Sequence, residues 1–227
     1  MHVIEAPSPN YDDRDAPVDM IILHYTGMRS GAAALARLRD PAAKVSAHYL
    51  IEENGDVYRL VDEVRRAWHA GVSSWKGRGG VNARSIGIEI VNPGHEFGYR
   101  AFPAAQIDAL VALMQDIRTR HDITPENVLG HSDVAPRRKE DPGEKFPWHR
   151  LAAEGLARAA PPVDPQAGGR VSYDEALAAL SAIGYDAPPG DHAAGLLAFQ
   201  RRFCPEALGQ GFSPATKAAL IAVSRSL

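Results

Sequence analysis

The sequence predicts an α/β fold, in which helices flank a central mixed β-sheet and a small three-helix bundle follows at the C-terminal end. Two continuous apolar runs, VDMIILHYTG at 18–27 and SIGIEIVN at 85–92, predict buried strands. Residues 103–122 carry apolar side chains at helical spacing and predict an amphipathic helix. From about residue 159 the composition changes to Pro, Gly and Ala, which is typical of a linker.

Shorter elements complete the predicted first domain. The segment 31–40 predicts a short helix, since a proline follows it. The segment 46–61 has two apolar runs around an Asn-Gly pair, the strongest short-range signal for a β-hairpin. The run NVLGH at 127–131 predicts a short strand that ends at His131.

The chain divides into a first domain at 1–158, a linker at 159–169 and a helical domain at 170–227. In the last of these, a serine followed by a proline at 213–214 is a strong start signal for a helix. Three helix-sized segments predict a small bundle, and they lie at 173–184, 192–203 and 213–227.

Composition excludes several classes of protein. The chain of 227 residues has a net charge of -3, which gives no indication of binding to nucleic acid or to an anionic membrane. Its longest apolar stretches are too short to cross a bilayer. One cysteine permits no internal disulfide, and the acidic, proline-rich start does not have the pattern of a signal peptide. We therefore expect a cytoplasmic protein, with a periplasmic or secreted one as the alternative.

Two of the nine histidines differ from the others in position. His24 and His131 both lie at the ends of predicted strands, where strand ends of one sheet can converge. With Asp141 on the loop after His131, three ligands for a zinc ion are available, and a fourth position would stay open for water. The alternative, a surface histidine or one that is hydrogen-bonded in the core, is the expectation for His2, His95, His121, His149 and His192.

Five stretches in register resemble the zinc-dependent N-acetylmuramoyl-L-alanine amidases of the amidase-2 family, which are related to phage T7 lysozyme and peptidoglycan recognition proteins. The resemblance covers about residues 18–150, and the stretches are ILHYTG, SAHYLIEENGDVYRLV, AWHAG, SIGIEIVN and GHSDVAPRRKEDPG. It implies that His24, His131 and Asp141 bind Zn²⁺. It also implies that Glu89 and Lys139 act on a substrate made of peptidoglycan fragments (muropeptides).

The residue types suit amide hydrolysis. A carboxylate such as Glu89 can take a proton from water and pass it to the leaving amine. Lys139 lies two residues before Asp141, so in an extended segment both side chains point the same way and the ammonium can stabilise an oxyanion. The alternatives are that Glu89 faces solvent and that Lys139 belongs to a solvated charge run with Arg137 and Arg138.

Other residues in the matching stretches have less specific roles. We expect His69 to contact the substrate, and Asn92 and Arg84 to bind carboxylates of a peptide stem. His48 either orients a metal ligand or is a buried structural histidine. Trp68 either packs in the core, which we favour, or forms a wall of the substrate groove.

The helical domain resembles the peptidoglycan-binding domain 1 family over about residues 170–227, through AFQRRF and PATKAAL. It departs from that family where CPEALGQG replaces a short glycine-aspartate turn, so a bundle that only stabilises the first domain is the alternative. We expect a zinc amidase in muropeptide recycling. An exported amidase acting on sacculi, a non-catalytic peptidoglycan-binding protein and a zinc peptidase acting within the stem peptide are the rivals.

Overall fold

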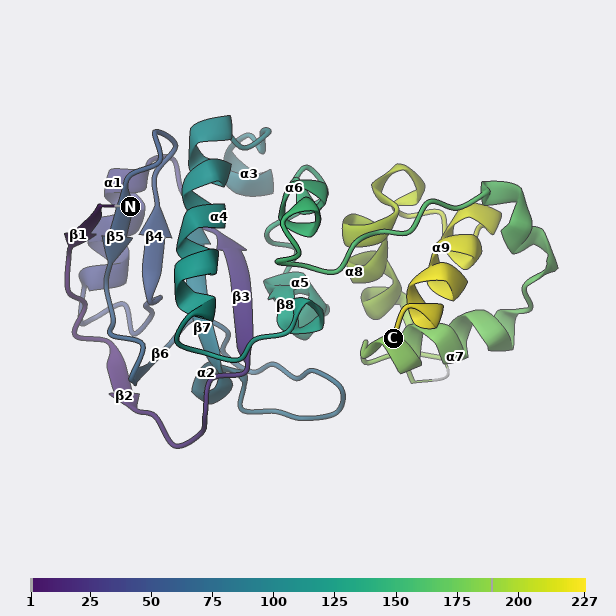
Figure 1. The fold of residues 1–227 in the computed structure, drawn as a ribbon, viewed down its shortest axis with the longest axis horizontal. Helices are drawn as coiled ribbons and strands as arrows, with labels where there is room; N and C mark the ends of the chain where they lie inside the picture. Colours follow the sequence, from purple (N-terminus) through teal and green to yellow (C-terminus); the bar gives the residue numbers. More distant parts are fainter. Residues whose placement is uncertain (1, 189) are drawn as a thin grey trace.

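A six-stranded sheet forms the centre of the first part of the chain in the computed structural model, which describes residues 2–188 and 190–227 (Figure 1). The strand order is β1-β5-β4-β7-β3-β8. Strands β4 and β5 pair antiparallel and all other neighbours pair parallel, so the predicted mixed sheet is confirmed. The strands are β1 (Val3–Glu5), β3 (Met20–Tyr25), β4 (Tyr49–Ile51), β5 (Val57–Arg59), β7 (Ser85–Ile90) and β8 (Val128–Gly130).

Helix α4 (Ala104–Arg118) covers one face of this sheet (Figure 1). Successive side chains of a strand point to opposite faces, so alternate residues of β3 enter two different cores. Ile21 and Leu23 pack with Leu110 and Met114 of α4, and every one of these side chains is completely buried. The apolar stripe read from the sequence is therefore the side of α4 that faces the sheet.

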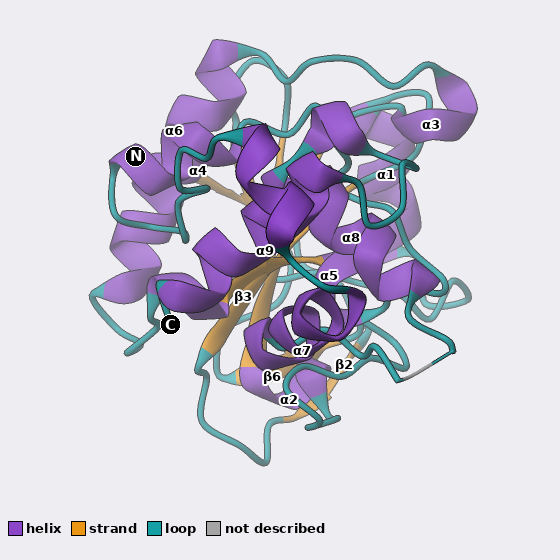
Figure 2. Cartoon of the chain, turned by 90° about the vertical axis from the view of Figure 1, so that its right-hand side faces the viewer, coloured by secondary structure: helices purple, strands orange, loops and turns teal. Residues whose placement is uncertain are grey.

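The other face of the sheet is covered by two separate units. Helix α1 (Gly31–Arg39) packs its Leu38 with Leu50 of β4. At the β3–β8 end, Met20 and Ile22 share one hydrophobic core with the C-terminal helices. These helices are α7 (Tyr173–Ile183), α8 (Ala193–Phe203) and α9 (Pro214–Arg225), which stand beside the sheet in Figure 1 and in front of it in Figure 2.

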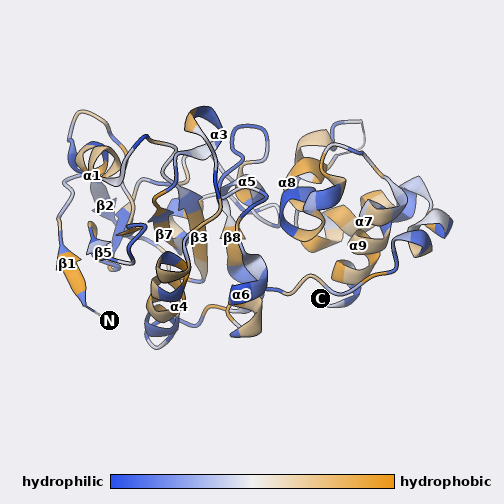
Figure 3. Ribbon diagram, turned by 90° about the horizontal axis from the view of Figure 1, so that it is seen from above, coloured by the Kyte–Doolittle hydropathy of each residue, from blue (hydrophilic) through white to orange (hydrophobic). Residues whose placement is uncertain are grey.

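The predicted bundle is thus present as three helices, and it is joined to the sheet by apolar packing. Strands β3 and β8 are coloured as hydrophobic in Figure 3, as expected for strands buried on both faces. The stretch predicted as a linker, 159–169, includes the start of a 3-10 helix, η2 (Pro165–Arg170). None of the described helices is long and apolar enough to span a bilayer.

Several short elements have no clear sequence signal. A small antiparallel ladder joins β2 (Tyr11–Asp13) to β6 (Arg65–Ala67). The other short helices are α2 (Val81–Arg84), α3 (Gly94–Phe97), α5 (His131–Val134), α6 (Trp148–Ala153), η1 (Pro125–Asn127) and η3 (Pro205–Ala207).

Candidate active site

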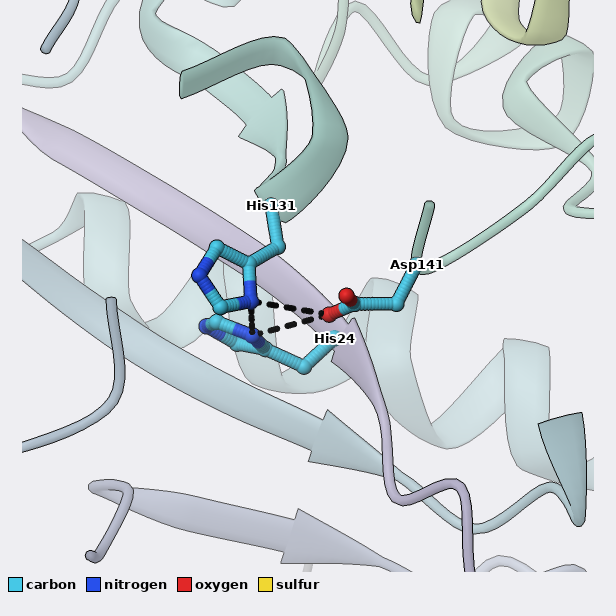
Figure 4. A group of neighbouring side chains, drawn as sticks. All are labelled: His24, His131 and Asp141. Atoms are coloured by element: carbon cyan, nitrogen blue, oxygen red, sulfur yellow. Dashed lines mark hydrogen bonds and ion pairs between the residues drawn. The ribbon is translucent and has the colours of Figure 1, made fainter. Parts of the chain in front are cut away.

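Three predicted metal ligands meet at the carboxyl ends of two neighbouring strands. His24 is the second-last residue of β3, and His131 follows β8 as the first residue of α5, while Asp141 lies on the loop beyond. The Nδ1 atoms of the two histidines are 2.9 Å apart, and each is 3.1 Å from Oδ2 of Asp141 (Figure 4). All three side chains are buried. Parallel pairing of β3 with β8 brings the strand ends to one edge, as the sequence led us to expect.

The tautomer of His131 follows from its second ring nitrogen. Nε2 of His131 lies 3.1 Å from the backbone carbonyl of Ala70, which can only accept a hydrogen bond. Nε2 therefore carries the proton in the neutral ring. The lone pair on Nδ1 is left to point toward His24 and Asp141.

The tautomer of His24 is set by a longer chain of hydrogen bonds. The Ser85 hydroxyl donates its one proton to the carbonyl of Val81 at 2.6 Å, so its oxygen accepts from Nε2 of His69 at 3.2 Å. Nδ1 of His69 is then an acceptor, and it receives the proton of His24 Nε2 at 3.0 Å. Nδ1 of His24 is consequently unprotonated. Such a chain is how proteins orient a histidine ligand.

Three acceptor atoms thus converge with no proton among them, and this donor set fits a cation. Two imidazole nitrogens and one carboxylate oxygen are ligands that zinc takes readily. Burial lowers the pKa of His24 to about 4, which keeps its ring neutral and available for ligation. Asp141 supplies the carboxylate oxygen of this set.

Glu89 lies next to this group because β7 and β3 are in register, with Glu89 opposite His24. Its side chain lines a cavity of about 550 Å³ together with all three ligand residues. Oε2 of Glu89 is buried and has no hydrogen-bond partner among the described residues. Burial and the charge of Asp141 raise the pKa of Glu89 well above its ordinary value, although Lys139 acts in the opposite direction. Glu89 thus lies in the cavity wall and does not face open solvent.

Lys139 lines the same cavity, opposite in charge to Glu89 and Asp141. Its neighbour Arg138, expected to be solvated, donates to the backbone carbonyls of Ala70 and Val72. Arg138 therefore ties the ligand loop to the segment whose Ala70 carbonyl orients His131. Arg138 is exposed, as expected for a solvated charge, and these hydrogen bonds fix its position at the surface.

His69, expected to contact the substrate, lines the cavity. It is buried behind His24 and reaches the cavity wall, but both its ring nitrogens are occupied by His24 and Ser85. The ring packs on Gly87 of β7, where a Cβ atom would lie 2.4 Å from it. A glycine in the middle of a strand is a sequence signal for such a close approach. Its hydrogen bond to Nε2 of His24 places His69 where it can orient that ring.

The two predicted carboxylate-binding residues do not line the cavity. Arg84 is the last residue of α2 and precedes the start of β7, whereas Glu89 lies near the end of that strand, and the guanidinium of Arg84 pairs with Asp19 at 2.8 Å. Asn92 is completely buried, where its amide donates to the carbonyl of Arg100 and accepts from the amide of Gly94. Both side chains are therefore occupied in holding backbone segments together.

His48 and Trp68 lie outside the cavity as well. Nδ1 of His48 accepts from the backbone amide of Gly87 at 2.9 Å, and Nε2 lies 3.1 Å from the carbonyl of Arg65. The histidine thus bridges strands as a structural residue. The indole of Trp68 donates to Asp12 at 2.6 Å and so ties β2 to the segment after β6.

Comparison with known proteins gives a consistent result. The family described as N-acetylmuramoyl-L-alanine amidase matches residues 14–144. The amidase AmiD of Escherichia coli K12 is 38% identical over 211 residues, which is 83% of this chain and 75% of AmiD. The 1,6-anhydro-N-acetylmuramyl-L-alanine amidase AmpD of Citrobacter freundii is 36% identical over 166 residues, which is 65% of this chain and 87% of AmpD.

Two solved structures match nearly the whole chain. E. coli AmiD in complex with anhydro-N-acetylmuramic acid-L-Ala-D-gamma-Glu-L-Lys superposes with a TM-score of 0.79 and 33% identity, covering 95% of this chain and 92% of that one. AmpDh3 of Pseudomonas aeruginosa in complex with anhydromuramic pentapeptide gives a TM-score of 0.80 and 35% identity, with 92% of both chains covered. Both matches therefore extend into the C-terminal helices.

Proposed function

Because this chain belongs to the N-acetylmuramoyl-L-alanine amidase family, we propose that it uses zinc to hydrolyse the bond between N-acetylmuramic acid and L-alanine in peptidoglycan fragments. One observation carries the zinc part of the proposal. Three buried, unprotonated ligand atoms of His24, His131 and Asp141 lie within 3.1 Å of one another, beside a carboxylate with an unpartnered oxygen.

A zinc ion held by these ligands would supply Lewis-acid activation of water and of the amide carbonyl. The carboxylate of Glu89 takes the proton that the attacking water loses as its oxygen bonds to the carbonyl carbon. The raised pKa of Glu89 suits it to hold this proton and then to deliver it to the amine of L-alanine as the C–N bond breaks. The ammonium of Lys139 stabilises the negative charge that develops on the carbonyl oxygen.

We propose soluble anhydromuropeptides as the substrate class. The related AmiD and AmpDh3 structures hold molecules of this kind, and a cavity of about 550 Å³ accommodates a ligand of that size. Soluble fragments are what muropeptide recycling in the cytoplasm would present, and we propose that setting. Fractionation of the native protein tests it, since recovery from the periplasm or medium would contradict it.

The complete ligand set argues against a binding protein without activity, and the family match argues against a peptidase that cuts within the stem peptide. Mass spectrometry of the products from a defined anhydromuropeptide distinguishes the amidase from the peptidase and from the binding protein. We expect a free sugar and an intact stem peptide that begins with L-alanine. A product cut inside the peptide would support the peptidase, and no product would support the binding protein.

Metal analysis tests the cofactor. We expect about one zinc per chain, and activity that is lost with a chelator and restored by zinc. His24→Ala and His131→Ala should lose both zinc and turnover, because each removes one of three protein ligands. His149→Ala is the matched control, since His149 is exposed and does not line the candidate site. Full zinc content and full activity in either ligand variant would refute the assignment.

A further inference from the structure

The segment 131–141 contains two metal ligands and Lys139, and it is held from outside by the C-terminal helices. Asp133, Arg137 and Glu140 of this segment all bond to residues beyond 184. The links lie between the two ligands in sequence, so they act on the part of the loop that sets the spacing of His131 and Asp141.

The link at Asp133 is completely enclosed. Oδ2 of Asp133 accepts from the Gly130 amide and from Nη1 of Arg202, both at 2.8 Å, and Oδ1 accepts from the Tyr185 hydroxyl at 2.7 Å. The side chains of Asp133 and Arg202 are 1% and 4% exposed, and Tyr185 is buried. Two of the three donors to this carboxylate therefore come from the C-terminal domain, while the third begins the turn that presents His131.

The position of Arg202 is itself fixed. Its guanidinium lies 4.0 Å from the ring centroid of Trp148 in α6 and 4.9 Å from that of Phe203. Val134, next to Asp133, belongs to the same hydrophobic core as Phe199 and Leu180 of the bundle. Helix α5 is thus packed and hydrogen-bonded against α8 over its short length.

The other two links are more exposed. Arg137 pairs with Asp191 at 3.0 Å, and Glu140 pairs with Arg201 at 3.4 Å. Exposed ion pairs contribute little on their own. A buried charged group that loses its partner is costly, so the Asp133 link is the one that can control the loop.

We propose that Tyr185 and Arg202 are positioning residues of the active site, through which the C-terminal domain fixes Asp133 and with it the metal ligand His131. The bundle is then a working part of the metal centre, whether or not it also binds glycan. The proposal rests on the proposed function in that it takes His131 as a zinc ligand. It predicts that the metal centre weakens when the domain contact is cut, with the ligands themselves intact.

The test uses full-length Tyr185→Phe, Arg202→Leu and Arg202→Lys. Tyr185→Phe removes one hydroxyl, and Tyr173→Phe is the matched control because Tyr173 is on α7 and 45% exposed. Chelator competition measures the zinc affinity of each variant. Kinetics on a soluble anhydromuropeptide give kcat and KM, and amide hydrogen exchange is followed at residues 130–135. Substitutions in the outer shell of a metal site typically weaken affinity by about 10–100-fold.

We expect a loss of zinc affinity in that range for Arg202→Leu and several-fold for Tyr185→Phe. Exchange at 130–135 should be faster in both, and kcat should fall more than KM rises. Arg202→Lys should recover part of the loss, and Tyr173→Phe should match the wild type. Folded Tyr185→Phe with wild-type zinc affinity, kcat and exchange would overturn the proposal. A wild-type protein without zinc or turnover would instead refute the proposed function, which separates the two failures.

Discussion

Two partly buried glutamates, Glu63 on the loop between β5 and β6 and Glu89 in the central strand β7, have opposite surroundings. Glu63 accepts hydrogen bonds from Tyr49, Arg120 and His121 at 2.7–2.8 Å. Glu89 has one oxygen buried without a partner among the described residues. Burial raises the pKa of Glu63, but its three donors reverse this and lower it to about 2. For Glu89, burial prevails and the pKa is raised well above the ordinary value.

The difference separates a structural carboxylate from a reactive one. Three donors hold Glu63 ionised, so it joins β4 to the end of α4 and has no capacity to accept a proton near neutral pH. Glu89 faces a cavity, carries an unsatisfied oxygen and has a raised pKa, which together are the marks of a general acid or base. Variants of the two glutamates should therefore affect different properties of the protein.

The largest effect is expected for Glu89→Gln. The amide keeps the shape of the side chain but cannot carry the proton from water to the leaving amine, so kcat should fall about 10²–10⁴-fold. Zinc content should be unchanged because the ligand atoms are intact. Turnover on an anhydromuropeptide and metal analysis of the same sample check both points. Wild-type kcat in this variant would remove Glu89 from the mechanism.

Glu63→Gln should affect stability, with no effect on turnover. The amide leaves Arg120 and His121 without their anionic partner, and the pKa of about 2 corresponds to about 3 kcal/mol of the free energy of unfolding at neutral pH. Urea unfolding at pH 7 measures the loss. A variant as stable as the wild type would mean that these hydrogen bonds contribute nothing net, and a large fall in kcat would break the distinction from Glu89.

Periodicity was sufficient to predict the buried strands, α4 and the three C-terminal helices, since each buries one regular apolar pattern. The predicted positions of His24 and His131 at strand ends were also sufficient to predict that they meet, because the carboxyl ends of parallel strands lie at one edge of the sheet. The short strands β1, β2 and β6 were missed, since three residues carry no periodic signal. Their positions depend on long-range pairing.

The site residues whose positions differ from the prediction are those whose partners no local sequence pattern identifies. Arg84 and Asn92 flank the Glu89 strand in sequence, but Asp19 and the Arg100 carbonyl determine where they point. The contact of Asp133 with Arg202 spans 69 residues and two domains. Such pairs have no local pattern, whereas Gly87 in the middle of a strand was a local sign that a ring such as His69 packs there.

The smallest effect, and the sharpest test of the comparison between Glu63 and Glu89, is the pH dependence of the stability of the two variants in zinc-free protein. The pKa of Glu63 is lowered on folding, so its contribution is complete above about pH 4.5 and is lost as the pH falls toward 2. The pKa of Glu89 is raised on folding, so its contribution to stability is complete below about pH 4.5. This contribution is lost as the pH rises through the pKa that Glu89 has in the folded protein. Relative to the wild type, Glu63→Gln should be less stable and Glu89→Gln more stable at pH 7.

Both differences in the free energy of unfolding should shrink on acidification, because the protonated carboxyl groups of the wild type are then uncharged, as the amides of the variants are. His48 supplies an internal reference. Burial lowers the pKa of His48 to about 3, so acid below about pH 6.5 destabilises all three proteins, and Glu63→Gln somewhat more because it lacks the charge of Glu63 that raises the pKa of His48. Urea midpoints at intervals from pH 7 to 3 should show this common decline with two differences of opposite sign superimposed on it. Differences of the same sign, or a Glu89→Gln difference that grows in acid, would mean that Glu89 is ionised and satisfied in the folded protein, as Glu63 is.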